Sequence, residues 1–548
     1  MKTSLILALV CCTSLYAFTA PETELKGADG KVIIRYVADV PKDIAPAGTS
    51  DPSKQVGLFL CFPEHERPTG DELYPVREAL RRQGILDNFI LIAGHSQALK
   101  MSLADHEPIR KLLEWALEKY PINPRRVYMY GKGEGGKVSG EFASTHPKLI
   151  AAAVTYSWGW WAMPSELDAP IDFEKSAPEF YMVLGMRDLA THIATVRDTY
   201  GRVREKGYHV IYREFDDLGA RTYHPASNDD AIAWVTRQRN KNIAPSAAES
   251  RLLAESQRAG AAGYFEKLAL VGGAPAGVII RKLLSTPDAA VRVAAAETCR
   301  HAMFDEQTSM ALGSRLTDPD LRVRRAAFRA LTMYAGWRSA AAQQALIDLA
   351  LHPEKAVAPE DRLSAVDGLA AAVRFQVKGV RQDPPMFHAL VSLLADKDEE
   401  VRTMAANLLA PIRDPEFRGD GGRPEKKAPE GGWSAWLDGI TAKEAGYRKD
   451  FQVCASGSST DAIQLFCQGG ELLKTRPSAG FAAMRKSADM GYVPAQAQLG
   501  LMYANGKGVQ QNYVEAGRWW AKAAEGGHAL AAANAARCPK VPVPGAIQ

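Results

Sequence analysis

Short apolar runs alternate with helix-like amphipathic stretches over the first 240 residues of the chain. The runs are rich in β-branched, aromatic and leucine side chains, and their lengths suit buried β-strands. They lie at residues 32–36, 56–62, 88–93, 127–130, 180–184 and 209–215. Helical patterns separate most of them, as at residues 71–83 and 107–119. This alternation predicts an α/β doubly wound, mostly parallel sheet over residues 21–242.

A different pattern begins near residue 247, where the chain becomes helical and repetitive. Three segments, at residues 283–297, 315–329 and 393–407, share Leu, then Asp, then Val-Arg, then small residues. The wide gap before the last copy leaves room for a degenerate one around residues 361–373. We expect each aspartate to cap the second helix of a pair and the small residues to allow close helix contact.

These segments resemble HEAT-type repeats, which implies stacked antiparallel helix pairs with a long exposed surface over residues 247–417. A generic helical bundle is the alternative. Proline, glycine and charged residues then crowd together up to residue 432. This composition predicts an exposed linker over residues 418–432.

The C-terminal region, residues 433–538, contains the sequence "AQAQLGLMYANGKGVQQNYVEAGRWWAKAAEGGHALAAA". Its spacing of Leu-Gly, Tyr, Gly, Trp-Trp and Ala-Ala closely resembles the Sel-one-like repeat, a relative of tetratricopeptide repeats. A second copy precedes it. The resemblance implies antiparallel helices joined by glycine turns. Trp519 and Trp520 belong either to the repeat core or to a ligand-stacking platform. We expect residues 431–457 to form an N-terminal helical cap, held by a Cys454–Cys467 bridge, unless both thiols are buried and reduced.

A glycine-rich turn, "YGKGEGGKVSG", follows the apolar run at residues 127–130 and precedes an alanine-rich helical stretch. It resembles the G-x-S-x-G nucleophile elbow of secreted, esterase- and depolymerase-like α/β-hydrolases. Gly133 occupies the serine slot. The later segments "APEFYMVLGMRD" and "FDDLGARTYHP" resemble the strand and loop that carry the acid and histidine of a triad. The resemblance implies that Asp188 and His224 are relic triad positions.

Two parts of the hydrolase machinery are missing from the sequence. Gly133 has no side chain to serve as a nucleophile. The loop after residue 62 has Pro63 and Glu64 where oxyanion donors are expected, and proline has no N–H. Ser96, in "GHSQA", is an outside candidate for the nucleophile, although its strand comes one element too early. The interpretation is a non-catalytic, hydrolase-like domain.

Residues 1–20 combine a lysine, a short apolar core and small residues, which predicts a cleaved signal peptide and export to the periplasm or beyond. Lipid attachment at the N-terminus stays open. No later segment is apolar and long enough to cross a membrane. The formal net charge of +4 over 548 residues, without dense basic runs, argues against nucleic acid as a partner. The absence of C-x-x-C and H-E-x-x-H motifs gives no support for zinc, and we expect no cofactor.

Three functions remain open from the sequence. The first is an exported scaffold that binds unidentified protein partners in the cell envelope through its repeats. The second is a secreted serine-type esterase with a non-standard nucleophile such as Ser96. The third is a carbohydrate- or peptide-binding protein that uses the old hydrolase cleft.

Overall fold

The computed structural model describes nine longer stretches of the chain and a few isolated positions between them. The stretches are residues 21–62, 72–95, 106–157, 178–185, 208–215, 225–258, 264–369, 384–409 and 476–526. The predicted signal peptide, the predicted linker and the predicted Cys454–Cys467 bridge lie outside the described residues. The domain boundaries drawn from the sequence therefore remain predictions.

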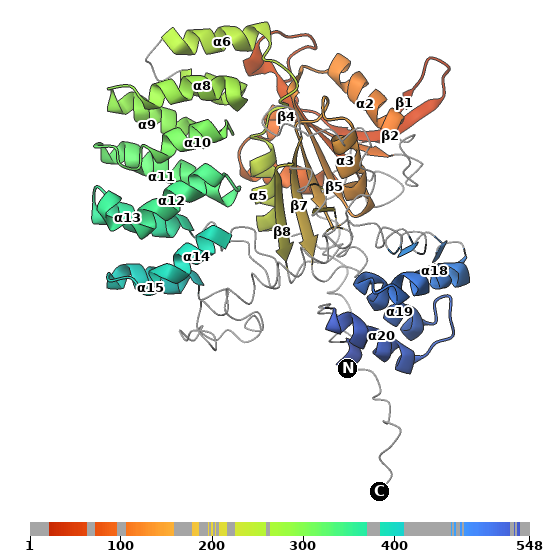
Figure 1. Ribbon diagram of the computed structural model, residues 1–548. Coiled ribbons are helices and arrows are strands. Elements are labelled where there is room, and N and C mark those ends of the chain that lie inside the picture. Colours follow the sequence, from red (N-terminus) through yellow and green to blue (C-terminus); the bar gives the residue numbers. More distant parts are fainter. Residues whose placement is uncertain are drawn as a thin grey trace, which may run out of the picture. The chain divides into compact units, whose positions relative to one another are not determined.

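An eight-stranded sheet forms the first part of the molecule (Figure 1). Its strands are β1 (Thr23–Lys26), β2 (Val32–Asp39), β3 (Val56–Phe62), β4 (Phe89–His95), β5 (Ile122–Lys132), β6 (Ala152–Tyr156), β7 (Glu179–Gly185) and β8 (Val210–Phe215). Their order is β1-β2-β4-β3-β5-β6-β7-β8. The pairs β1–β2 and β2–β4 are antiparallel, and all the others are parallel.

The central strands are buried on both faces, as expected for parallel strands covered by helices. Every residue of β3, β6 and β7 is buried. The six apolar runs all form strands, which confirms the α/β fold class. Two strands were not predicted. β1 is short and polar, and β6 has the sequence AAVTY, whose alanines do not distinguish a strand from a helix.

Helices cover both faces of the sheet. They are α1 (Tyr74–Arg82), α2 (His106–Lys119), α3 (Glu134–Thr145) and α5 (Pro225–Val235), with short 3₁₀ turns η1 (Pro52–Lys54) and η2 (Leu86–Asn88). The buried side chains of α1 and α5 share one apolar cluster with β3, β4 and β7. Figure 1 shows α3 across the sheet from α5. The carboxyl end of β5 leads directly into α3, which covers one face of the sheet.

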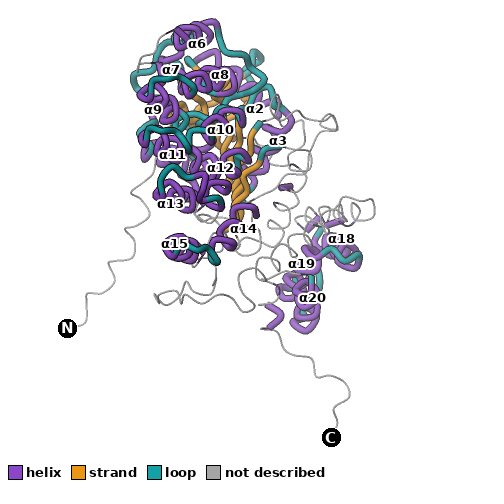
Figure 2. The backbone as a smooth tube through the Cα atoms, turned by 60° about the vertical axis from the view of Figure 1, so that its left-hand side comes forward, coloured by secondary structure: helices purple, strands orange, loops and turns teal. Residues whose placement is uncertain are grey.

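Stacked helices follow the sheet along the chain (Figures 1 and 2). They are α6 (Ala247–Arg258), α7 (Tyr264–Val271), α8 (Gly273–Leu284), α9 (Ala289–Thr298), α10 (Glu306–Gly313), α11 (Leu321–Gly336), α12 (Ala340–Leu351), η5 (Pro353–Lys355), α13 (Pro359–Gly368), α14 (Pro384–Leu393) and α15 (Glu399–Leu409). One apolar cluster runs continuously from α7 to α15. The helices share a compact unit with the sheet.

The repeat pattern has the physical roles expected from the sequence. Asp288 and Asp320 cap α9 and α11 by accepting hydrogen bonds from the backbone N–H two residues on, and Asp398 does the same for α15. The alanines that recur in the three repeat segments, at positions 295, 327 and 405, are fully buried between helices. Small side chains at these positions let neighbouring helices approach closely.

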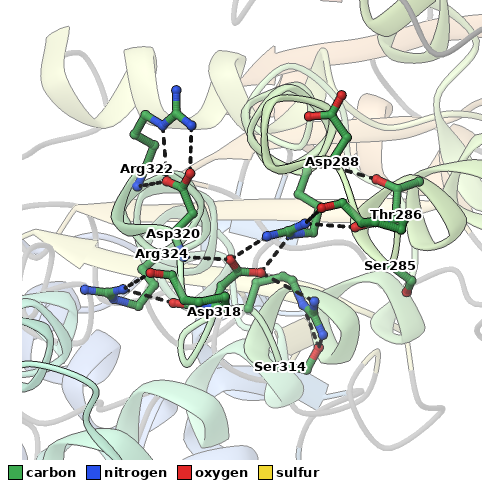
Figure 3. Close-up of polar contacts among 12 residues, drawn as sticks. Ser285, Thr286, Asp288, Ser314, Asp318, Asp320, Arg322 and Arg324 are labelled. Atoms are coloured by element: carbon green, nitrogen blue, oxygen red, sulfur yellow. Dashed lines mark hydrogen bonds and ion pairs between the residues drawn. The ribbon is translucent and has the colours of Figure 1, made fainter.

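Buried ion pairs join each repeat to the next, in what we call the ladder. Arg292 of α9 makes two hydrogen bonds of 2.8 Å to Asp318, which precedes α11. Arg324 of α11 lies 2.8 Å from Asp361 of α13, and Arg362 of α13 is bidentate to Asp396 before α15. Figure 3 shows the carboxylate of Asp318 within this network. Bidentate geometry makes the Arg292 and Arg362 contacts directional as well as attractive.

The second compact unit contains α18 (Pro477–Asp489), α19 (Val493–Asn505) and α20 (Tyr513–Glu525). Gly506, in the left-handed conformation at φ 63°, ends α19. The indole of Trp520 covers Gly500, where a β-carbon would come within 2.3 Å of the ring. The Leu-Gly and Trp-Trp parts of the repeat signature are therefore two halves of one helix contact.

Candidate functional site

A sharp turn joins β5 to α3 at Gly133. Its φ of 57° and ψ of −128° place it in a region that favours glycine. The Gly133 N–H donates to the Tyr156 carbonyl at 2.9 Å, and the Gly133 carbonyl accepts from the Gly136 N–H at 2.9 Å. The turn is thus fixed to the end of β6 on one side and to the first turn of α3 on the other.

Two neighbouring glycines are required by close approach of the backbone. A β-carbon at Gly131 would lie 1.9 Å from the Gly135 carbonyl oxygen, and one at Gly136 would lie 2.9 Å from the Tyr156 oxygen. Both separations are too short for any side chain. The glycines of "YGKGEGG" therefore let the end of the strand pass close to the first turn of the following helix. This is the backbone form of a nucleophile elbow.

The elbow has the backbone of a nucleophile position but none of its chemistry. Gly133 offers no oxygen or sulfur atom for covalent catalysis. α3 beneath it is almost entirely buried, and its Ser139 is fully buried within the helix rather than exposed on the turn. The turn lies at the carboxyl ends of the parallel strands, the edge at which α/β folds usually bind ligands.

Ser157 was not singled out in the sequence, and it lies beside the elbow. It directly follows Tyr156 at the end of β6 and has a φ of 62°. Its N–H donates to the Val183 carbonyl at 2.8 Å, and its side chain is 1% exposed. Its Oγ has no hydrogen-bond partner among the residues that the structure describes. A serine directly after an apolar strand was the only sequence signal for it.

The remaining predicted hydrolase positions fall outside the described residues. Ser96 directly follows β4, and β3 lies between β4 and β5 in the sheet. Asp188 comes three residues after β7, and His224 directly precedes α5. Pro63 and Glu64 follow β3. Their assignments remain predictions from sequence.

The tryptophan pair lies in the core of the second unit. Trp519 is 4% exposed and Trp520 is 7% exposed. Trp520 donates from Nε1 to the Ala497 carbonyl at 3.2 Å. The Arg485 guanidinium lies 4.9 Å and the Lys522 Nζ lies 4.6 Å from the centroid of a Trp519 ring. The two cations cover Trp519 by cation–π contact, so stacking of a ligand there requires them to move.

Other site chemistry is sparse in the described part of the chain. Cys61 and Cys299 are free and buried, and burial raises the pKa of both thiols, which makes them unreactive. No group of three or more His, Cys, Asp or Glu side chains that could hold a metal ion occurs among the described residues. Within the same residues, no helix combines the length and the apolar character needed to span a bilayer.

Comparisons with known proteins agree with the two repeat predictions. Residues 493–528 match the family model of the Sel1 repeat, and residues 278–370 match that of HEAT repeats. Both resemblances drawn from the sequence are confirmed. No curated protein matches the chain significantly.

Several solved esterase structures resemble the chain. They include a thermostable esterase (19% identity, 40% of this chain and 63% of that chain, TM-score 0.31). An S-formylglutathione hydrolase from Staphylococcus aureus has 12% identity over 40% of this chain and 96% of its own, with a TM-score of 0.31. A ferulic acid esterase has 13% identity over 40% and 97%, also with a TM-score of 0.31. This chain thus spans less than two thirds of the thermostable esterase.

The strand order and the elbow are properties of the chain itself, and they carry the fold assignment. The chain combines a hydrolase-like α/β layer with HEAT repeats and a Sel1 repeat.

Proposed function

We propose that this chain is an exported protein–protein interaction scaffold whose hydrolase-like layer is non-catalytic. The observation that carries the proposal is Gly133, which occupies the nucleophile position of an elbow whose backbone geometry is complete. Two helical-repeat modules in the same chain support it, because stacked repeats present extended surfaces to partners. The partners are proteins of the cell envelope, and nucleic acid is not among them.

A p-nitrophenyl ester panel tests the catalytic half of the proposal. We expect no turnover above background from the full chain. Turnover that is lost in Ser96→Ala or in Ser157→Ala would replace the proposal with a serine esterase that uses that residue. Gly133→Ser restores an oxygen at the elbow but no oxyanion donor. Loss of one such donor costs about 10²–10³-fold in rate, so we expect little activity from this variant.

Capture from the envelope fraction with matched variants tests the scaffold half. Gly500→Val places atoms where the Trp520 ring lies and should disrupt the second unit locally. Ala521→Val, at an exposed position of α20, is its control. A partner that rebinds the purified wild type and Ala521→Val stoichiometrically, but not Gly500→Val, supports a scaffold acting through the Sel1 repeat. The absence of any stoichiometric partner would contradict the scaffold.

Export is tested separately. N-terminal sequencing of protein from the envelope fraction should begin after residue 17 or residue 20, where small residues suit signal-peptide cleavage. An intact N-terminus on cytoplasmic protein would contradict export.

A further inference from the structure

Arginines of the α/β layer contact the C-terminal ends of alternate helices of the HEAT array. We call this set the clamp. Its members and the helix ends that they contact are Arg239 at α7, Arg237 just past α9, and Arg213 at α11. Arg237 and Arg239 follow α5, and Arg213 lies on strand β8. Arg239 is 8% exposed and Arg213 is 2% exposed. Burial lowers the pKa of Arg237 to about 10.

Arg239 closes the end of α7. Its Nη2 donates to the Ala269 and Leu270 carbonyls at 3.1 Å, and its Nε donates to the Val271 carbonyl at 3.2 Å. The last carbonyls of a helix have no partner within the helix and carry its negative end charge. Arg125 of β5 adds a second contact to the Val271 carbonyl at 3.0 Å. One helix end is therefore held by two guanidinium groups.

The next two helix ends are held in the same way. Arg237 donates from Nε to the carbonyl of Arg300, two residues past α9, at 2.9 Å. Arg213 donates from Nη2 to the Gly336 carbonyl, the last residue of α11, at 2.6 Å. These contacts repeat along the stack, so they form one continuous border rather than an isolated bond.

An apolar contact strengthens the same border. Trp337, directly after α11, is 5% exposed and belongs to the apolar cluster of the sheet rather than to that of the helices. Its Nε1 donates to Asp230 of α5 at 3.2 Å, and the Arg237 guanidinium lies 5.2 Å from its ring centroid. A bulky side chain buried in the neighbouring layer resists sliding of one part over the other.

We propose that the α/β layer acts as a clamp for the HEAT array, binding the C-terminal ends of α7, α9 and α11 so that each of these helix ends is held against local opening. This assigns a binding role to the layer that does not depend on the elbow. Arg125 lies near the start of β5 and Gly133 just past its end, about 26 Å apart at the rise of a strand. Arg125, which shares the end of α7 with Arg239, is therefore at the opposite end of β5 from the elbow.

Hydrogen exchange of the full chain, read by mass spectrometry, tests the clamp one helix end at a time. We expect Arg239→Met to speed exchange in peptides covering the end of α7, and Arg237→Met and Arg213→Met to do so at α9 and α11. Each increase should be roughly tenfold and local, because a charge-assisted hydrogen bond is lost at that end. Peptides from α14 and α15 serve as the internal reference.

Arg322→Met is the matched control, since its side chain is 70% exposed and pairs with Asp320 of its own repeat. Where a methionine variant does not fold, the lysine variant replaces it. Lysine keeps the positive charge but lacks the planar guanidinium with its several N–H donors, so the local increase in exchange rate should be smaller. Increases confined to the matching helix ends support the clamp. No increase, an increase equal to that of the control, or a uniform increase across α14 and α15 would overturn it.

Discussion

Arginine holds two borders of this molecule together, and it uses different acceptors at each. Between repeats, Arg292 meets the carboxylate of Asp318. Between the array and the α/β layer, Arg237 and Arg239 meet backbone carbonyls at helix ends. The first border joins two similar units, and the second joins two unlike folds. Repeats of one kind can each carry an acid at the same position, so an arginine of one repeat meets a carboxylate of its neighbour. A sheet and a helical array share no such spacing, but every helix ends in unpaired backbone carbonyls, whatever its sequence.

The difference has an energetic consequence. Removing one partner of a buried ion pair leaves the other charge buried without compensation. Removing an arginine from a helix end leaves neutral carbonyls, which cost less to leave unpaired. The ladder should therefore be more sensitive to single substitutions than the clamp.

The largest effect is expected for Arg292→Met in the ladder. Asp318 has a side chain that is only 1% exposed, so the substitution should lower the free energy of unfolding by about 3–5 kcal/mol. Chemical denaturation of the full chain, followed by circular dichroism, measures it. Arg322→Met, with an exposed side chain, should change stability by less than about 1 kcal/mol. Equal losses in both variants would show that the ladder pair is no stronger than a surface pair.

Arg237→Met in the clamp should have the second largest effect. The loss should be about 1.5–3 kcal/mol, from the charge-assisted hydrogen bond to the Arg300 carbonyl and the contact with Trp337. The same denaturation experiment measures it. A loss as large as that of Arg292→Met would remove the energetic distinction between the two borders.

Acid pH should reduce the contribution of the ladder to stability but not that of the clamp. Burial alone would raise the pKa of Asp318, but the hydrogen bonds from Arg292 and from the Asp320 N–H reverse this and lower it. A carboxylate with a lowered pKa stabilises the fold above the usual carboxyl range and loses that contribution as pH falls through its folded-state pKa. The penalty of Arg292→Met should therefore shrink as pH falls from the usual carboxyl range through the folded-state pKa of Asp318. The acceptor of Arg237 is a carbonyl and does not titrate there.

Thermal unfolding of both variants and the wild type at pH 7 and pH 3 measures this difference. The difference in unfolding temperature between wild type and Arg292→Met should be smaller at pH 3 than at pH 7. The difference between wild type and Arg237→Met should be nearly the same at both pH values. A parallel narrowing of both gaps would mean that titration elsewhere in the chain dominates.

The smallest effect is expected for the caps of the repeats. Asp288→Ala removes the hydrogen bond to the Ala290 N–H at the start of α9 and should cost about 1 kcal/mol. Ser285→Ala, at an exposed position of the same turn, should cost less than about 0.5 kcal/mol. Differential scanning calorimetry resolves the pair. Indistinguishable midpoints would contradict the capping role.

Much of the candidate site was predictable because its constraints are local. Gly131, Gly133 and Gly136 are required by a backbone crossing within six residues, and such short-range contacts leave a sequence signature. Ser157 could not be assigned to the same site, because it comes from a different strand. Only the pairing of β6 with β5 brings it beside the elbow.

The sequence by itself determined the apolar runs of the sheet, the glycine elbow, the repeat caps and the repeat families. In each case the physical cause acts over a few residues or recurs at a fixed spacing. The degenerate HEAT copy shows the limit of such local patterns. Asp361 and Arg362 are adjacent on α13, yet they pair with residues of the previous and the next repeat. The tertiary structure alone decided the clamp, because its acceptors are backbone carbonyls. Every residue has a carbonyl, so no side-chain pattern marks which of them an arginine will meet.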